Sequence, residues 1–401
     1  MNILFLTISR IDDILERGIY TDLVRKFRDE GHSVFIATPT ERRYKQQTEL
    51  FEQDNIRLLK IKTLNFQKTN IIEKGIGTLL IEYQFLIAVK KYFAEIKFDL
   101  VLYSTPPITF TKVVRYIKQN HLAKSYLLLK DIFPQNAVDL MMMKKNGFIH
   151  RFFETKEKEM YAISDSIGCM SMANVEYIHR NNPSLKPEIV HINPNSIEPE
   201  NVLLTKLEKN EIRKQFGIPN NKTIFVYGGN LGKPQGVDFL IEVIAANVAT
   251  KNIFFVIVGS GTEFDKMDKW FKLNQPSHAI LLTSLPKKEY DKLVQACDVG
   301  LIFLDKRFTI PNYPSRLLSY LEYKMPIITA TDSITDIGTE AELNGYGFYC
   351  ENGNLELINT HIKLLTENQK LVQTMGEKGH QYLLENFTVE KSYSIIMNQL
   401  N

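Results

Sequence analysis

The stretch Thr223-Ile224-Phe225-Val226-Tyr227-Gly228-Gly229-Asn230-Leu231-Gly232-Lys233-Pro234-Gln235-Gly236 joins an apolar run to a glycine-rich turn. The run suits a buried parallel strand, and a helical pattern starts near Val237. In such a strand–turn–helix unit, glycines let backbone N–H groups approach a phosphate, and the helix N-terminus favours negative charge. Lys233 would add a cation, and Asn230 and Gln235 would add hydrogen-bond donors. Because the turn is neither a Walker loop nor the G-x-G-x-x-G fingerprint, it predicts a phosphate site of another kind, with a ligand-free glycine turn as the alternative.

Two later segments of the same half point to the same chemistry. Val256-Ile257-Val258-Gly259-Ser260-Gly261 is another strand that ends in glycines, which either approach a ligand or only allow close packing. Pro314-Ser315-Arg316 opens a helical pattern, with Ser315 near the N-cap and Arg316 in the first turn. A cation there opposes the helix dipole, so a bound diphosphate would explain Arg316, while an ordinary surface arginine is the alternative.

Strand-like and helix-like segments alternate along the whole chain, which implies right-handed βαβ units on parallel sheets. A break with turn chemistry at Asn193-Pro194-Asn195 separates two series, so two successive doubly wound α/β domains are the simplest account. Such domains bind ligands at the carboxyl ends of their strands, and we expect the site in the cleft between the two. The expected strands are 3–7, 32–38 (stopped by Pro39), 56–61, 99–103, 125–129, 189–192, 223–227, 254–258, 280–282, 299–303 and 326–330, and the expected helices include 20–30, 76–93, 355–365 and 389–400.

Length, charge and cysteine usage bound the class of protein. The 401 residues suggest two or three domains, and a net charge of +3 is too balanced for a dedicated nucleic-acid binder. The net charge is +6 through Asn195 and −3 beyond it, which indicates either an anionic partner for the first half or scatter among solvated side chains. With widely spaced cysteines, no signal peptide and no run of about 20 apolar residues, we expect a cytoplasmic protein that is soluble or lies on a membrane without crossing it. The cysteines are Cys169, Cys297 and Cys350.

In this order, the two glycine turns and the Pro-Ser-Arg segment resemble the nucleotide-sugar domain of GT-B glycosyltransferases, specifically glycosyltransferase family 4. The resemblance spans almost the whole chain: Gly31-His32-Ser33-Val34 is similar to the start of the family's second strand, and Asp131-Ile132-Phe133-Pro134 resembles the D-x-W-P segment of the branch that builds capsules and O-antigens. It implies an α/β fold of the GT-B type, with two Rossmann-like doubly wound domains facing across a cleft. The implied domains are an acceptor- and membrane-facing domain at 1–195, a nucleotide-sugar domain at 196–385 and a C-terminal helix at 386–401 that packs back on the first domain.

The resemblance also implies which residues hold the substrates. Where the broad family has an Arg and a Lys in the first turn, Asn230 and Gln235 stand here, a form that is similar to the capsule and O-antigen branch. The family's two glutamates near the donor sugar align with Pro311 and Ser319, so their roles do not carry over, and a 6-deoxy or amino sugar with fewer hydroxyls would fit. The implied donor-binding residues are Gly229, Asn230, Lys233, Gln235, Gly259, Gly261, Ser315, Arg316 and Ser319, and the implied acceptor-side residues are Arg17 and Gly18.

Glycosyl transfer needs stabilisation of a departing diphosphate. No D-x-D pair follows a strand in the second domain and no histidine pair has metal-ligand spacing, so we expect no metal and no cofactor, and Lys233 and Arg316 would carry this role. Retention of configuration, which family membership implies, requires no protein nucleophile. If the transfer inverts, a base must take the acceptor proton, and Asp131 at a strand end is the candidate, with a helix N-cap as its structural alternative.

Residues 139–153 join a Met-rich run to Lys, Arg and Phe. This composition suits the headgroup boundary of an anionic membrane, and core packing of the same residues is the alternative. The predicted membrane-facing residues are Met142, Lys144, Lys145, Phe148, Arg151 and Phe152.

These features predict a glycosyltransferase on the inner face of the cell membrane. It would move a sugar, such as N-acetyl-L-fucosamine or a related N-acetylated amino sugar, from a UDP-sugar to an undecaprenyl-diphosphate-linked acceptor in capsule or O-antigen synthesis. The alternative enzyme is a non-hydrolysing nucleotide-sugar epimerase, which shares the architecture but has no use for a lipid-facing segment. A periplasmic sugar-binding protein is a third class, against which the missing signal peptide argues.

Overall fold

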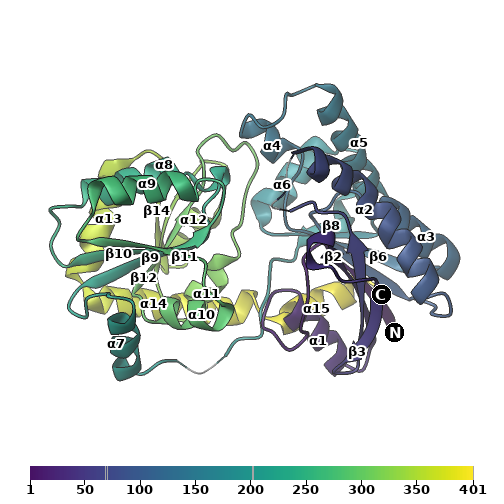
Figure 1. Cartoon of the computed structure of the whole chain (residues 1–401), viewed down its shortest axis with the longest axis horizontal. Helices are drawn as coiled ribbons and strands as arrows, with labels where there is room; N and C mark the ends of the chain where they lie inside the picture. Colours follow the sequence, from purple (N-terminus) through teal and green to yellow (C-terminus); the bar gives the residue numbers. More distant parts are fainter. Residues whose placement is uncertain (68, 70, 201–202, 401) are drawn as a thin grey trace. The chain divides into compact units, whose positions relative to one another are not determined.

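The computed structural model describes residues 1–67, 69, 71–200 and 203–400, and it shows two compact units (Figure 1). Unit 1 comprises residues 1–198 together with 388–401, and unit 2 comprises residues 199–387. Each unit is built on one parallel or mainly parallel sheet with helices on both faces. The predicted α/β class with two doubly wound sheets is therefore confirmed.

The sheet of unit 1 has the strand order β3-β4-β2-β1-β5-β6-β7-β8. The edge strand β3 pairs antiparallel with β4, and the other described pairs are parallel. Inner strands are apolar along their length because both faces of a parallel sheet are covered; Leu4 and Phe5, for example, are fully buried. The strands are β1 (Asn2–Leu6), β2 (Ser33–Glu41), β3 (Glu49–Gln53), β4 (Ile56–Thr63), β5 (Leu100–Ser104), β6 (Lys124–Leu129), β7 (Ser166–Cys169) and β8 (Val190–Ile192).

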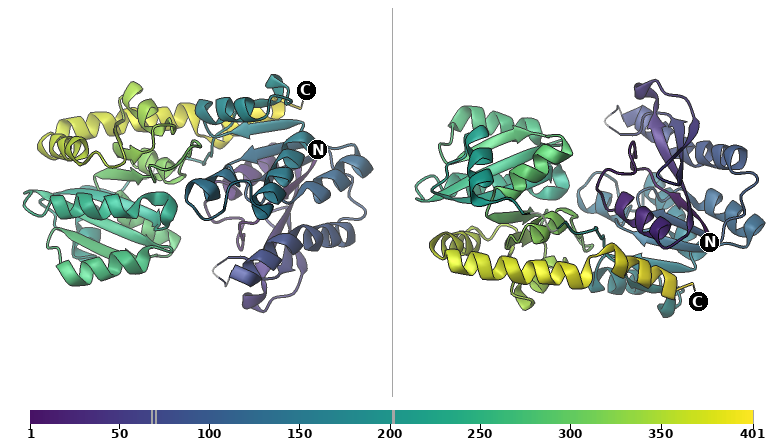
Figure 2. Two further views of the ribbon diagram at one scale, coloured as in Figure 1. Left: turned by 90° about the horizontal axis from the view of Figure 1, so that it is seen from above. Right: turned by 90° about the horizontal axis from the view of Figure 1, so that it is seen from below.

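Helices cover both faces of this sheet. The connections that carry α2, α3 and α5 cross the sheet in the same direction, so right-handed crossovers put these helices on one face, where α3 contacts both α2 and α5. The connection through α1 runs the other way, and α1 packs against the C-terminal helix α15 (Figure 2, right view, purple and yellow). The helices are α1 (Thr21–Asp29), α2 (Ile71–Tyr92), α3 (Thr111–His121), α4 (Gln135–Asp139), α5 (Phe148–Ile163), α6 (Met172–Asn181) and α15 (Val389–Asn398), with 3₁₀ turns η1 (Arg42–Tyr44) and η2 (Pro187–Ile189).

Unit 2 has a parallel sheet of strand order β11-β10-β9-β12-β13-β14. Its core lies between this sheet and α8, α13 and α14, and it includes the fully buried Phe225, Phe255 and Ile358. The strands are β9 (Thr223–Asn230), β10 (Ile253–Ser260), β11 (Ala279–Thr283), β12 (Val299–Phe303), β13 (Ile327–Thr331) and β14 (Gly347–Glu351). The helices are α7 (Lys206–Gln215), α8 (Val237–Ala246), α9 (Phe264–Asn274), α10 (Lys287–Gln295), α11 (Arg316–Glu322), α12 (Ile337–Leu343), α13 (Leu355–Glu367) and α14 (Gln369–Asn386), with the 3₁₀ turn η3 (Lys233–Gln235).

The prediction that Pro39 stops the second strand was wrong, because β2 continues to Glu41. Backbone groups of alternate residues point to alternate neighbours, and the Ala37 carbonyl oxygen accepts from Thr7 N on the β1 side. Pro39, two residues on, faces the same side, where the pairing with β1 has already ended at Ala37. The missing N–H of proline therefore removes no ladder bond there.

Candidate active site

The carboxyl ends of β9 and β12 form the topological switch point of unit 2. These strands lie side by side, but the chain leaves β9 toward β10 and leaves β12 toward β13. The two loops therefore diverge, and open α/β sheets bind ligands in the crevice that such divergence leaves. The predicted donor residues lie at the carboxyl ends of β9 and β10, in the turns that follow these strands, or in α11 and its N-cap.

Glycines bring the backbones of neighbouring strands close together at this edge. Gly229 has φ of +117°, a conformation that side chains disfavour. A Cβ on Gly259 would overlap the carbonyl oxygen of Gly229, its partner in the β9–β10 ladder. A Cβ on Gly261 would overlap the carbonyl group of Leu231. These glycines therefore allow the neighbouring backbones to lie close together. Because glycines carry no side chains, they also leave this edge of the sheet uncovered.

Arg316 joins the start of α11 to the turn after β9. Its Nη2 donates to Oε1 of Gln235 at 2.7 Å, and its guanidinium lies 4.4 Å from the ring centre of Tyr227. Nη1 is buried and has no hydrogen-bond partner among the described residues. A buried guanidinium nitrogen without an acceptor is costly, so this atom is suited to bind an anion.

Most of the other predicted donor residues are exposed. Lys233 is exposed at the start of η3 and lines a cavity of about 480 Å³ with Glu263, Lys266 and Arg307, on the α8 side of the turn. Arg316 is not part of that lining. Gly229, Asn230, Gly261 and Ser315 are exposed, and Gln235 and Ser319 are half-buried; Ser315 is the N-cap of α11 but makes no side-chain capping bond.

Two tyrosines that were not predicted support the same edge. The Tyr320 hydroxyl accepts from Gly228 N at 3.2 Å, and its ring fills the space beside Gly300. The Tyr290 ring lies against Gly228, where a Cβ would overlap its hydroxyl, and burial raises its pKa to about 12. The available signal was weak, because a tyrosine at helical spacing is ordinarily read as core.

In unit 1, Asp131 lies just after β6, beside the carboxyl end of the neighbouring strand β5. Its backbone N–H donates to Oγ1 of Thr105 at 3.1 Å, and its Oδ1 accepts from Nδ2 of Asn136 at 3.0 Å. Burial raises the pKa of the Asp131 carboxyl to about 6, against the lowering effect of the Asn136 hydrogen bond. A carboxylate in this range can hold or release a proton near neutral pH, which is the property of a general base. Asp131 caps no described helix: the N-cap of α4 is Pro134.

The neighbouring Lys130 was not predicted. Its Nζ donates to the carbonyl oxygen of Asn193 at 3.0 Å, and burial lowers its pKa to about 7. The Asn193 side chain in turn donates to the Tyr126 hydroxyl at 2.8 Å and accepts from Ser392 Oγ at 2.8 Å. These hydrogen bonds hold in place the chain segment that carries Lys130 and Asp131.

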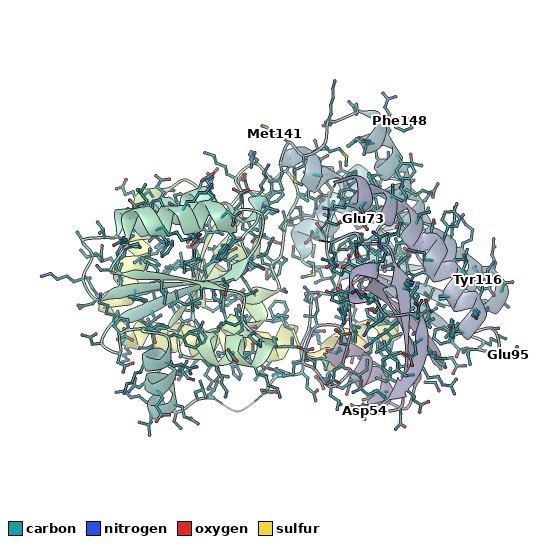
Figure 3. The ribbon with its side chains drawn as sticks, viewed as in Figure 1. Asp54, Glu73, Glu95, Tyr116, Met141 and Phe148 are labelled. Atoms are coloured by element: carbon teal, nitrogen blue, oxygen red, sulfur yellow. The ribbon has the colours of Figure 1, made fainter. Side chains whose placement is uncertain are left out.

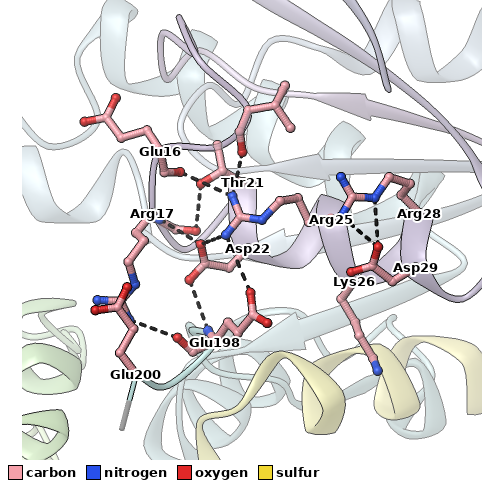
Figure 4. A network of polar contacts seen from close by, with 12 residues as sticks. Glu16, Arg17, Thr21, Asp22, Arg25, Lys26, Arg28, Asp29, Glu198 and Glu200 are labelled. Carbon is pink, nitrogen blue, oxygen red and sulfur yellow. Dashed lines mark hydrogen bonds and ion pairs between the residues drawn. The ribbon is translucent and has the colours of Figure 1, made fainter. Parts of the chain in front are cut away.

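The predicted acceptor-side residues Arg17 and Gly18 lie in a polar network around Asp22 (Figure 4). Asp22 is 1% exposed; it accepts from Gly18 N at 3.0 Å and from Glu198 N at 3.0 Å, and it pairs with Arg25 at 2.7 Å. Arg17 Nη2 donates to the carbonyl oxygen of Glu198 at 2.9 Å. The loop after β1 is thus fastened to the last residues of the first segment of unit 1, and Asp22, which the sequence did not single out, is its anchor.

The predicted membrane segment lies at the surface of unit 1. Met142, Lys144, Lys145, Phe148 and Arg151 are exposed, with Phe148 at 90%. Figure 3 shows Met141 and Phe148 on the outside of the ribbon. Phe152 differs, because it is half-buried and its ring packs on Phe153 with centroids 5.2 Å apart.

The described residues contain no helix that is both long and apolar enough to cross a membrane. Within the same residues, no group of three or more His, Cys, Asp or Glu side chains is placed to hold a metal ion. The three cysteines are buried free thiols.

Comparison with known sequences matches residues 208–382 to the family model described as "Glycosyl transferases group 1". This range lies within unit 2 and contains the turn after β9, the end of β10 and the start of α11. Among curated proteins, the chain is 22% identical over 285 residues to a protein named as a glycosyltransferase, WbjE, of Pseudomonas aeruginosa, covering 71% of this chain and 69% of that protein. It is 26% identical over 134 residues to a protein named as a colanic acid biosynthesis glycosyl transferase, WcaI, of Escherichia coli (strain K12), covering 33% and 32%.

Solved structures resemble the whole chain. Sucrose-phosphate synthase from Thermosynechococcus elongatus has a TM-score of 0.76 at 14% identity, covering 100% of this chain and 98% of that one. Anabaena Alr3699/HepE, solved in complex with UDP and glucose, has a TM-score of 0.71 at 16% identity, covering 100% and 99%. At these identities the likeness shows the fold alone, which is the GT-B fold with two Rossmann-like sheets.

Proposed function

We propose that this chain, a group 1 glycosyltransferase that uses a nucleotide-sugar donor, transfers an N-acetylated amino sugar from UDP to an undecaprenyl-diphosphate-linked acceptor. N-acetyl-L-fucosamine is the proposed sugar, and capsular polysaccharide or O-antigen synthesis is the proposed pathway. The distant relationship to a colanic acid biosynthesis protein supports a role in building polysaccharides. The bond that forms is a new glycosidic bond, and the bond that breaks joins the sugar to UDP.

The observation that carries the donor assignment is the unsatisfied Nη1 of Arg316 beside Gly229, at the switch point of unit 2. A departing diphosphate gains negative charge in the transition state, so a preorganised cation there lowers the barrier. Gln235 holds the guanidinium through Nη2 and leaves Nη1 for a phosphate oxygen. Lys233, exposed in the same turn, adds a second cation.

The donor sugar is proposed from what the site lacks. By the family resemblance, Pro311 and Ser319 align with two glutamates near the donor sugar, and neither residue offers a carboxylate. A site with fewer acceptors favours a sugar with fewer hydroxyls, because unmatched polar groups cost binding energy. A 6-deoxy sugar with an acetamido group meets this condition.

The acceptor side is proposed in unit 1. Gly18 and Arg17 would line the acceptor site, and Asp131 would take the acceptor proton in an inverting transfer. A retaining transfer needs no such base, so the effect of replacing Asp131 on turnover distinguishes an inverting from a retaining transfer. The exposed residues Met142, Lys144, Lys145, Phe148 and Arg151, with Phe152 behind them, would bring the chain to the lipid that carries the acceptor.

The test is a thermal-shift screen of the full chain against nucleotide sugars, because a ligand that binds the native state raises the midpoint of unfolding. We expect stabilisation by UDP and by UDP-N-acetylated amino sugars, and less by GDP-sugars. UDP release that requires an undecaprenyl-diphosphate-linked sugar would identify the transferase, whereas sugar interconversion without an acceptor would identify the alternative epimerase. A chain that no UDP compound stabilises would contradict the donor assignment.

A further inference from the structure

Helix α2 has a second apolar face that the described residues of unit 1 leave about half exposed. Five of its described large apolar side chains are exposed: Ile76 (48%), Leu79 (48%), Leu80 (41%), Tyr83 (47%) and Ile87 (67%). At about 100° per residue they fall within an arc of roughly 100°, and they extend along about 16 Å of the helix. Such a run of large apolar side chains is more than the scattered exposed leucines of an ordinary surface.

The opposite face of α2 already holds the helix on unit 1. Ile81, Phe85 and Val89 are 2% exposed or less and lie about 180° from the exposed group. Packing within unit 1 therefore explains one apolar face and leaves the other unexplained. A helix that is apolar all round is normally buried on all sides, so the exposed face of α2 calls for a partner.

The charges around this face are positive. Lys90 and Lys91 are exposed one turn beyond Ile87, and Lys112 of α3 lies 3.8 Å from the ring centre of Tyr83. The two described acidic residues of α2 are each paired with a neighbour, and Glu82 is also buried while Glu73 is half-buried. Glu82 is 4% exposed and accepts from Lys112 N at 2.5 Å, and Glu73 pairs with Arg42 at 2.8 Å.

We propose that the exposed face of α2 docks on an anionic lipid membrane. Apolar side chains bordered by lysines match a lipid surface with negative headgroups, and they do not match a polar protein surface or a second copy of the same basic face. The α2 face lies in the same helical layer of unit 1 as α5, whose first residues Phe148 and Ile149 are 90% and 61% exposed. This inference rests on the proposed lipid-linked acceptor and adds the surface that would meet the lipid.

The experiment is vesicle co-sedimentation of the full chain with phosphatidylglycerol/phosphatidylethanolamine vesicles and with phosphatidylcholine vesicles. We expect the wild type to bind the anionic vesicles, and Leu79→Gln/Ile87→Gln to lower that binding at least 10-fold. Glutamine is a good helix former and both positions are exposed, so the fold should be kept. The matched control is Leu273→Gln/Leu343→Gln, two leucines of unit 2 that are 84% and 86% exposed, and it should bind as the wild type does.

A second variant, Lys90→Gln/Lys91→Gln, should weaken binding to anionic vesicles and lower the unfolding midpoint only slightly, through loss of the Lys90 contact with the Tyr116 ring at 4.5 Å. The proposal is overturned if the wild type binds neither vesicle, or if the α2 variant binds as tightly as the control. It is also overturned if the wild type is a dimer in solution that Leu79→Gln/Ile87→Gln makes monomeric, because the face is then a protein interface. Stabilisation of these variants by UDP is read separately, so failure of the donor assignment leaves this test interpretable.

Discussion

At the residue scale, the buried carboxyl of Asp131 should reduce the stability of the folded chain at neutral pH. Its pKa of about 6 lies above the ordinary value of 3.8, so the unfolded chain loses this proton first as the pH rises. The destabilisation is absent near pH 3.5, grows between pH 4 and 6, and reaches up to about 3 kcal/mol above pH 6. Asp131→Asn should therefore raise the free energy of unfolding at pH 7.5 and raise it less at pH 4.5, as measured by urea unfolding.

Asp165 supplies the matched control of opposite sign. Burial raises its pKa, but hydrogen bonds from Lys118 and Ser125 outweigh that effect and the pKa is lowered overall. Asp165→Asn should thus destabilise the chain at pH 7.5.

The activity of the Asp131→Asn variant tests the proposed base: kcat/KM should fall by about 10²-fold or more if Asp131 takes the acceptor proton. In that case the wild-type kcat/KM rises with pH through about 6, whereas full turnover by the variant excludes the inverting role.

Arg316 is the residue on which donor binding should depend most strongly. Arg316→Met keeps much of the side-chain volume over Tyr227 but removes both the bond to Gln235 and the free Nη1. Loss of one preorganised donor to a developing anion costs about 10²–10³-fold in kcat. We expect that loss in steady-state kinetics, together with a smaller thermal shift by UDP. Arg180→Met, at an exposed position of α6, should leave both unchanged; equal effects of the two variants would contradict the assignment.

At the element scale, the close approach of β9 and β10 should make Gly259 intolerant of any side chain. A Cβ there would overlap the Gly229 carbonyl oxygen, so β9 and β10 must separate next to the turn that follows β9. We expect Gly259→Ala to destabilise unit 2 by about 1–3 kcal/mol and to weaken UDP binding. The control is Gly75→Ala in α2, where no atom lies within 4 Å of the added Cβ and helix propensity predicts a gain of about 0.5–1 kcal/mol. Urea unfolding with and without UDP separates the two outcomes.

The burial and length of each strand explain which strands could be predicted from the sequence. Inner strands such as β12 (Val299–Phe303) were predicted because burial on both faces leaves a continuous apolar run. The edge strand β3 (Glu49–Gln53) and the short β7 (Ser166–Cys169) were missed, since half-exposed or four-residue strands carry no such run. In the site, local motifs identified Arg316 and Gln235, but their mutual bond spans 81 positions and follows from the sheet order. Lys130 and Asp22 were missed because burial leaves no local sequence pattern. Burial lowers the pKa of Lys130, and the buried Asp22 anchors the loop after β1.

At the scale of the whole molecule, unit 1 is made of two segments separated by all of unit 2. The second segment, α15, supplies buried contacts: Ile396 is fully buried, and the Tyr393 ring packs edge-on against Phe27 with centroids 5.0 Å apart. Two hydrogen bonds add to this closure, from Ser392 Oγ to Asn193 Oδ1 at 2.8 Å and from Val389 N to the Ile197 carbonyl at 3.0 Å. Unit 1 therefore depends on chain that is distant in sequence, whereas unit 2 is continuous.

This arrangement predicts unequal effects of losing the C-terminus. A chain ending at residue 387 should lose stability in unit 1, because truncation exposes the core around Phe27 while every residue of unit 2 is retained. The milder variant Ile396→Ala should cost about 2–5 kcal/mol, and its control Leu384→Ala, at a 46% exposed position of α14, should cost far less. Scanning calorimetry should show one transition moved to lower temperature and a second that UDP still raises. If the temperatures of both transitions fall together, or if UDP no longer shifts either transition, α15 stabilises unit 2 as well. The prediction that α15 stabilises unit 1 alone would then be wrong.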